Sequence, residues 1–280
     1  MKILMLSDVY FPRVNGVSTS IQTFRRELGR LGHEVWVVAP EYGSSAEEEE
    51  GVSRVPSRQV LFDPEDRMMR SGPLGRRLRA LNGRGFDLVH VQTPFVAHYA
   101  GLRLARHWGV PCVETYHTFF EEYLFHYLPV LPKSAWRAVA RLFSRRQCNR
   151  LNGLVVPSRA MREVLERYGV RTTMRVIPTG MPLDAFQEGD REAFRVRHGI
   201  AVDQPTLVFV GRVAFEKNIE FLLEVVRALK QTSHPDIVLI VAGEGPAEGR
   251  LHRLAGELGV RDNLRFVGYL ARGTDLASCY

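Results

Sequence analysis

Hydrophobic residues along this chain fall into short runs that alternate with segments of helical spacing. The runs at residues 2–6 and 88–91 predict buried strands, because strands of a parallel sheet covered on both faces are apolar throughout. Between them, Ile21, Phe24 and Leu28 recur at helical spacing and predict the first helix. The same arguments predict strands at residues 35–39, 111–115, 153–156 and 175–177, and helices at residues 96–107, 133–150 and 159–168.

The pattern restarts after a polar stretch rich in glycine and proline, residues 181–204, with strands predicted at residues 206–210, 237–242 and 264–267. Alternating strands and helices are typical of parallel sheets with helices on both faces. We therefore predict an α/β fold of two Rossmann-like, doubly wound units, residues 1–181 and 182–280. The second unit has three strands where such a sheet normally continues, so we expect it to be truncated.

Composition indicates a globular protein of the cytoplasm. Hydrophobic residues make up 45% of the 280 residues, and no apolar run approaches the ~20 residues of a membrane span. Residues 1–8 meet an acid after few apolar positions, which is typical of a strand and not of a signal peptide. Cys112, Cys148 and Cys279 are far apart, so neither a disulfide framework nor a metal site is predicted.

The net charge of +7 is concentrated in two stretches. Residues 67–86 and residues 133–151 each hold six basic residues and no acid, and together they contribute +12, which leaves −5 for the rest of the chain. Local charge of this kind favours a local anionic partner. Nucleic acid is not predicted as that partner, because no nucleic-acid-binding motif accompanies the basic stretches.

Two loops at the predicted carboxyl edges of the sheets are candidate anion sites. In the first, residues 7–18, Gly16 would let a ligand approach the backbone at the start of a helix, where free N–H groups favour a diphosphate. In the second, Arg212 and Lys217 suit phosphate oxygens and Asn218 is expected to cap the next helix. The first loop is neither a G-x-G-x-x-G nor a P-loop, and the alternatives are a plain glycine turn and a solvated basic turn.

Two weaker candidates lie at other strand ends. Gly243, in the run 242–246, suits either a nucleotide contact or a tight turn. His117 lies just past the strand at residues 111–115, on the edge where ligands bind. A lone histidine has a structural role more often than a functional one, so both roles stay open.

In their joint order and spacing, these segments resemble glycosyltransferase family 4, whose members have the GT-B fold. The resemblance covers nearly the whole chain, although each motif alone is weak. The motifs are Asp8-Val9-Tyr10-Phe11-Pro12 with Asn15-Gly16-Val17, Tyr116-His117-Thr118, Ile177-Pro178-Thr179-Gly180, Gly211-Arg212 with Glu216-Lys217-Asn218, Ala242-Gly243-Glu244-Gly245-Pro246, and Phe266-Val267-Gly268-Tyr269-Leu270.

The resemblance implies two units facing across a cleft, the first on the acceptor side and the second binding the donor nucleotide. It implies retaining transfer of glucose or mannose from a UDP- or GDP-linked sugar, with no metal and no cofactor. By position, Gly16 would face the donor diphosphate, Arg212 and Lys217 would hold it, and His117 would lie by the donor sugar. Further donor contacts would come from Gly243 and from the backbone of Tyr269 and Leu270, which would meet the base.

Two departures from the family pattern affect this expectation. Ala271-Arg272 stand where the family usually has an acidic residue, which bears on the base contacts. The family's E-x7-E element, which holds the donor's sugar and ribose, would lie beyond Tyr280. We therefore expect this chain by itself to bind donor poorly and to turn over little or nothing.

The acceptor is predicted to be a membrane lipid, because the chain most resembles diacylglycerol glucosyltransferases and phosphatidylinositol mannosyltransferases. Two basic segments also have the pattern of amphipathic helices that rest on an anionic bilayer, which would make the enzyme peripheral to the inner face of the membrane. Their apolar residues are Trp136, Val139 and Phe143 in one segment and Leu74, Leu78 and Leu81 in the other. The alternative is that these residues belong to the core and the arginines are simply solvated.

Two other functions fit the same fold. A nucleotide-sugar epimerase would invert one centre of the sugar and need no acceptor, so it would consume donor alone. A non-catalytic module would bind a sugar nucleotide or a membrane without any transfer.

Overall fold

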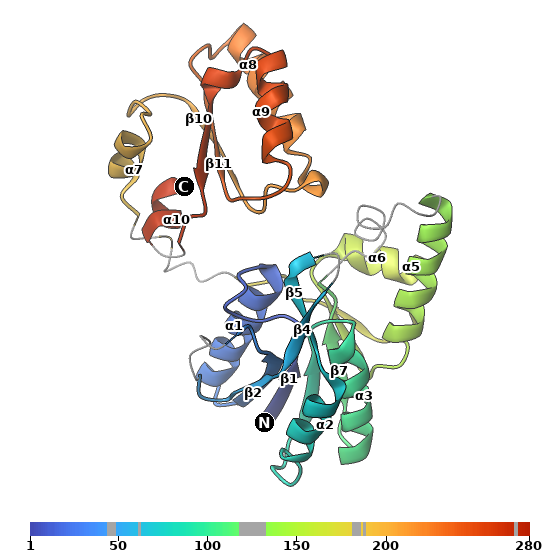
Figure 1. Cartoon of the computed structure of the whole chain (residues 1–280). Coiled ribbons are helices and arrows are strands. Elements are labelled where there is room, and N and C mark those ends of the chain that lie inside the picture. Colours follow the sequence, from blue (N-terminus) through green and yellow to red (C-terminus); the bar gives the residue numbers. More distant parts are fainter. Residues whose placement is uncertain (44–48, 61–62, 118–132, 181–185, 187–188, 272–273) are drawn as a thin grey trace. The chain divides into compact units, whose positions relative to one another are not determined.

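The computed structural model describes residues 1–43, 49–60, 63–117, 133–180, 186, 189–271 and 274–280. Its chain divides into two compact units, Met1–Met181 and Pro182–Tyr280 (Figure 1). Each unit has its own sheet and its own hydrophobic core.

The first unit is built on a seven-stranded sheet in the order β3-β2-β1-β6-β7-β8-β9, in which every neighbouring pair is parallel. The strands are β1 (Lys2–Leu6), β2 (Glu34–Pro40), β3 (Val52–Val55), β6 (Leu88–Val91), β7 (Cys112–Thr115), β8 (Gly153–Val156) and β9 (Met174–Val176). Because all of them run in one direction, the loops that follow them meet at one edge of the sheet.

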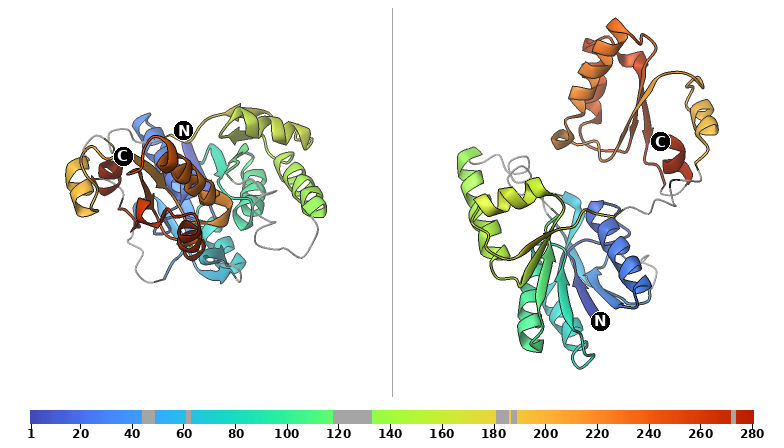
Figure 2. Two further views of the ribbon diagram at one scale, coloured as in Figure 1. Left: turned by 90° about the horizontal axis from the view of Figure 1, so that it is seen from above. Right: turned by 180° about the vertical axis from the view of Figure 1, so that it is seen from behind.

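Helices cover both faces of this sheet (Figure 2). Alternate residues of β1 point to opposite faces, so Leu4 belongs to one core cluster while Met5 packs with Ile21 of the first helix in another. The helices are α1 (Gly16–Arg30), α2 (Ser71–Arg79), α3 (Val96–Trp108), α5 (Lys133–Cys148) and α6 (Arg159–Arg167). Within the described residues, no helix has the length and apolar character needed to cross a bilayer.

The second unit has a three-stranded parallel sheet in the order β10-β11-β12. Its strands are β10 (Thr206–Val210), β11 (Val238–Ala242) and β12 (Leu264–Gly268). The central strand β11 is buried along its whole length. The helices α8 (Ile219–Thr232) and α9 (Glu248–Glu257) pack on one face, and α7 (Arg191–Arg197) and α10 (Thr274–Cys279) lie on the other.

The prediction of an α/β protein with doubly wound parallel sheets is confirmed. Two features were not predicted. An antiparallel hairpin joins β4 (Ser57–Val60) to β5 (Asp63–Met69), although Asp63, Pro64 and Glu65 are poor strand formers. Helix α7 lies within a stretch predicted to be polar connection, where the side chain of Asp190 caps it by accepting from the amide of Ala193 at 2.9 Å.

Candidate functional site

Three loops join at the carboxyl edge of the second sheet. The amide of Gly211, after β10, donates to Ala242 O at 2.9 Å, and the amide of Gly243, after β11, donates to Gly268 O at 2.7 Å. These bonds bring together the loops that carry Arg212, Gly243 and Tyr269, as the resemblance implied. Arg212 is half-buried, the side chain of Tyr269 is 56% exposed, and Leu270 packs against the core.

Close backbone packing explains the glycines of the loop after β11. A Cβ atom at Gly243 would lie 2.9 Å from the carbonyl carbon of Gly211 and closer still to its oxygen, and one at Gly245 would lie 2.8 Å from the carbonyl carbon of Val213. Real Cβ atoms do not approach backbone this closely, so these positions exclude any side chain. Glycine at Gly243 therefore has a structural cause, and a donor contact there remains a prediction.

Lys217 is an exposed cation beside the start of α8. It ends a short 3-10 turn, Phe215–Lys217, and among the described side chains none forms an ion pair with its ammonium group. Asn218 occupies the N-cap position of α8, as expected, but its side chain makes no cap hydrogen bond. Its backbone lies in the left-handed region at φ 49°, ψ 39°, whereas a capping residue has extended backbone.

A surface hollow of about 290 Å³ also lies in the second unit. It is lined by His198, His252, Ala255, Arg261, Leu264, Arg265 and Phe266. None of the predicted donor residues lines this hollow.

In the first unit, Gly16 begins α1 with open space beside it. The side chain of Asn15 caps the helix by accepting from the amide of Ser18 at 2.8 Å. A Cβ atom at Gly16 would meet no atom within 4 Å. Packing within the described protein therefore does not demand glycine at this position.

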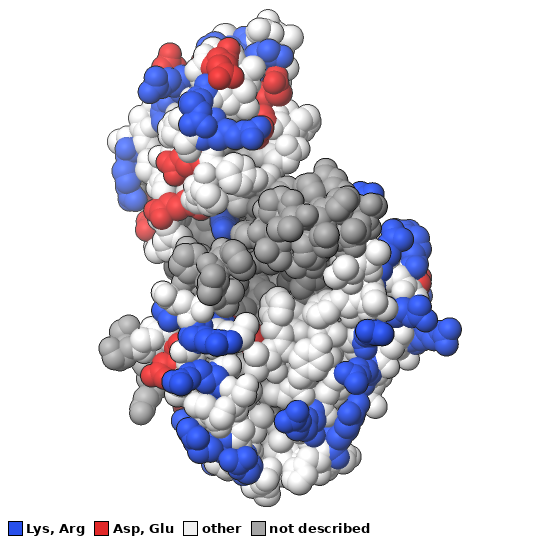
Figure 3. Space-filling view, turned by 45° about the vertical axis from the view of Figure 1, so that its right-hand side comes forward, with Lys and Arg blue, Asp and Glu red and all other residues white. Residues whose placement is uncertain are grey.

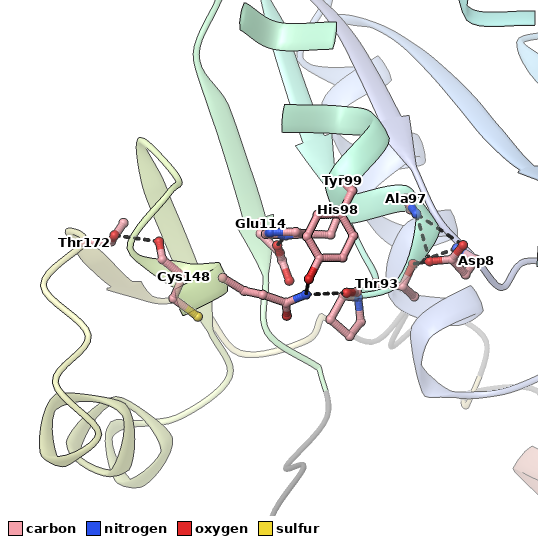
Figure 4. A network of polar contacts seen from close by, with 10 residues as sticks. Asp8, Thr93, Ala97, His98, Tyr99, Glu114, Cys148 and Thr172 are labelled. Atoms are coloured by element: carbon pink, nitrogen blue, oxygen red, sulfur yellow. Dashed lines mark hydrogen bonds and ion pairs between the residues drawn. The ribbon is translucent and has the colours of Figure 1, made fainter. Parts of the chain in front are cut away.

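Asp8 fixes the start of the same loop to α3. Its carboxylate accepts from the hydroxyl of Thr93 at 2.8 Å and from the amide of Ala97 at 3.1 Å (Figure 4). Burial raises the pKa of Asp8 to about 6, and these hydrogen bonds offset part of that rise. The same network includes a buried pair in which Nδ1 of His98 lies 2.6 Å from Oε2 of Glu114.

His117 contacts Gln92 at the carboxyl edge of the first sheet. Its Nε2 lies 3.0 Å from Oε1 of Gln92, and burial lowers the pKa of His117 to about 4. Neither Gln92 nor Asp8 was singled out for a side-chain role from the sequence. The contact of Gln92 with His117 and that of Asp8 with Thr93 each join residues far apart in the chain, so local spacing in the sequence does not predict them.

The two basic segments differ in what they expose. In α2 the leucines Leu74 and Leu78 are buried in the core, which corrects the expectation of an exposed apolar face there, while its arginines face solvent. In α5, Val139 and Leu142 remain 46% and 49% exposed. Figure 3 shows Lys and Arg side chains along the side of the first unit on which α5 lies. The side chain of Trp136 lies outside the described residues.

The chain is similar to known glycosyltransferases in sequence. Residues 14–185 match the family described as Glycosyltransferase Family 4, and residues 190–280 match Glycosyl transferases group 1. Over 97% of its length it is 31% identical to the alpha-monoglucosyldiacylglycerol synthase of Streptococcus pneumoniae, and over 90% it is 30% identical to a GDP-mannose-dependent alpha-mannosyltransferase of Mycobacterium tuberculosis. The chain spans 62% and 65% of the length of these two relatives.

Solved structures share the fold. The chain superposes on Anabaena HepE in complex with UDP with a TM-score of 0.71 at 17% identity. The superposition includes 100% of this chain and 72% of HepE. Its TM-score with sucrose-phosphate synthase from Thermosynechococcus elongatus is 0.72 at 17% identity, with 100% and 73% of the two chains covered.

Proposed function

Because this chain belongs to Glycosyltransferase Family 4, we propose that it transfers a hexose from a nucleotide-diphosphate sugar to an acceptor with retention of anomeric configuration. One observation carries this proposal most directly. The joined loops after β10, β11 and β12 gather Arg212 and the Tyr269 loop at one sheet edge, with Lys217 exposed beside α8. Backbone groups and two cations at such an edge suit a nucleoside diphosphate.

In the proposed reaction, Arg212 and Lys217 stabilise the negative charge that develops on the departing diphosphate. The bond between the anomeric carbon and the diphosphate oxygen breaks, and the acceptor oxygen bonds to that carbon from the same face. The acceptor's proton passes to the departing phosphate oxygen. In this scheme Gly16 faces the diphosphate, His117 lies by the donor sugar, and the backbone at Gly243, Tyr269 and Leu270 meets the nucleotide.

The variant Gly16→Ala tests the diphosphate contact. Because the added methyl meets no described protein atom, the free energy of unfolding should change by less than about 0.5 kcal/mol. If the donor packs against this glycine, the same methyl should lower kcat/KM by about tenfold or more through a higher donor KM. Normal kinetics would remove Gly16 from the donor site.

The assay supplies the full-length protein with UDP-glucose or GDP-mannose and with vesicles that contain diacylglycerol or phosphatidylinositol. Formation of a glycolipid from one of these donors supports the proposal and identifies the base and the sugar. An altered sugar nucleotide in the absence of acceptor would indicate an epimerase instead. Donor binding with no transfer to either lipid would indicate a non-catalytic module.

The proposal includes a lipid acceptor and peripheral attachment to the inner face of the cytoplasmic membrane. The support is α5, where exposed Val139 and Leu142 lie beside basic residues, and the name of the pneumococcal relative, which refers to diacylglycerol. Each basic residue near an anionic surface is worth ~1 kcal/mol. The double variant Arg145→Gln/Arg146→Gln should therefore lower the affinity for anionic vesicles, measured by co-sedimentation, by about 30-fold.

The matched control for this test lies in α2. The double variant Arg76→Gln/Arg79→Gln removes the same charge from a helix whose apolar face is buried, so it should change vesicle binding much less. Equal losses in the two variants, or equal binding to neutral vesicles, would contradict a bilayer contact through α5.

A further inference from the structure

The contact between Gln92 and His117 has a consequence for the chemistry of the histidine. Gln92 directly follows β6, and His117 lies two residues beyond β7, the neighbouring parallel strand. Their side chains meet at 3.0 Å, between Oε1 of Gln92 and Nε2 of His117. Gln92 is 1% exposed, so water does not compete strongly for this carbonyl oxygen.

The backbone around Gln92 is held on several sides. Its own amide donates to Leu6 O at 2.9 Å, and the hydroxyl of the next residue, Thr93, donates to Asp8. The carbonyl of Pro94 accepts from Nε2 of Gln147 in α5 at 2.6 Å. The Gln92 side chain therefore starts from a fixed position and can orient a neighbouring ring.

The imidazole of His117 is neutral near pH 7, because burial lowers its pKa to about 4. Its titratable neighbour His90 is neutral as well, since burial lowers the pKa of His90 to about 3. A neutral imidazole carries one proton, on either Nδ1 or Nε2. A carbonyl oxygen can only accept a hydrogen bond, so a ring that meets Oε1 through Nε2 has its proton there.

We infer that Gln92 is a positioning residue that holds His117 as the Nε2–H tautomer, which leaves Nδ1 as an acceptor for a hydroxyl group of the bound sugar. Among the described residues, none donates a hydrogen bond to Nδ1 of His117. The identity of the ligand rests on the proposed function, whereas the tautomer is a property of the protein alone. A reversed Gln92 amide would instead leave the proton on Nδ1 and make the ring a donor.

This inference predicts a selective effect on sugar recognition. In Gln92→Met the ring loses its partner, so the affinity for UDP-glucose or GDP-mannose should fall by about tenfold. The affinity for UDP or GDP alone should not change, because Nδ1 contacts the sugar and not the nucleotide. An equal loss for the sugar nucleotide and its nucleoside diphosphate would show a general structural defect.

The deciding experiment is a long-range ¹H–¹⁵N correlation spectrum of the ¹⁵N-histidine-labelled full-length protein at neutral pH, with His117 assigned through His117→Asn. We expect the Nε2–H pattern in the unmodified protein and a mixture of tautomers in Gln92→Met. In Gln92→Glu the carboxylate should raise the pKa of His117, and its titration should move upward from about 4.

Thr115→Val is the matched control, because Thr115 contacts Nε2 of His90 at 2.8 Å and not His117. It should change the His90 signals and leave those of His117 as they are. An Nδ1–H pattern in the unmodified protein, or an unchanged pattern in Gln92→Met, would overturn the inference. The expected tautomer in a protein that transfers no sugar would contradict the proposed function and leave the positioning role intact.

Discussion

The buried carboxyl of Asp8 should make the first unit more stable as the pH falls toward 5. Its pKa is about 6 in the folded protein and 3.8 when unperturbed, so the folded state binds the proton more tightly than the unfolded state. The stabilisation from protonation is fully present below 3.8 and is lost as the pH rises through about 6. At 1.36 kcal/mol per pKa unit, this difference amounts to about 3 kcal/mol.

The variant Asp8→Asn removes this dependence, because an amide does not titrate. Roughly half of the 3 kcal/mol falls between about pH 5 and about pH 7.5, so the free energy of unfolding of the parent relative to the variant should drop by about 1.5 kcal/mol across that interval. A change in the hydrogen bonds to Thr93 and Ala97 would shift this difference by a constant and would not alter its slope.

Tryptophan fluorescence during urea unfolding measures the required quantity. The three tryptophans, Trp36, Trp108 and Trp136, all lie in residues 1–181, so their signal reports the first unit and not the second. Glu163→Gln, at an exposed position in α6 of the first unit, removes the same charge and is the matched control, which should give a flat difference. A flat difference for Asp8→Asn, or a parent that gains stability relative to the variant as the pH rises, would refute the reasoning.

Three substitutions in the second unit test the other structural arguments. Gly243→Ala should lower the free energy of unfolding by about 3 kcal/mol or more, because the added Cβ meets the Gly211 carbonyl. Its control, Gly249→Ala, meets no atom within 4 Å and should melt no earlier than the parent by circular dichroism. Asn218→Gly should raise the stability by up to about 1 kcal/mol by relieving the left-handed backbone, and a decrease would show that the asparagine side chain stabilises the turn. Lys217→Ala should leave the stability within about 0.5 kcal/mol but lower kcat/KM about 10²-fold, and unchanged kinetics would exclude Lys217 from the donor site.

Strands with a strong local pattern could be predicted from the sequence. The apolar runs at residues 88–91, 153–156 and 206–210 coincide with β6, β8 and β10, because a short apolar run bounded by turns is a strong local signal for a strand of a parallel sheet. The β4–β5 hairpin could not be found in this way. Its second strand contains Asp63, Pro64 and Glu65, and its pairing with β4 outweighs their poor strand propensity.

In the candidate site, too, some features could be predicted from the sequence and others could not. Loops that follow parallel strands must meet at one edge, so the grouping of Arg212, Gly243 and Tyr269 followed from strand order. The backbone of Asn218 did not follow, because the left-handed conformation depends on the 3-10 turn before it. The contact of Gln92 with His117 joins positions 25 residues apart, and no local spacing rule predicts the orientation of either side chain.

The tight contact between the loops after β10 and β11 limits how the proposed donor site could be redesigned. Gly243 and Gly245 have no room for a side chain, so a mutant library that varies them would yield mostly unfolded members. Between and beside them, Glu244 and Pro246 point their side chains into solvent. Diversity confined to these two outward positions would alter the rim of the loop while its backbone keeps the same path, which makes them the first choice for directed evolution.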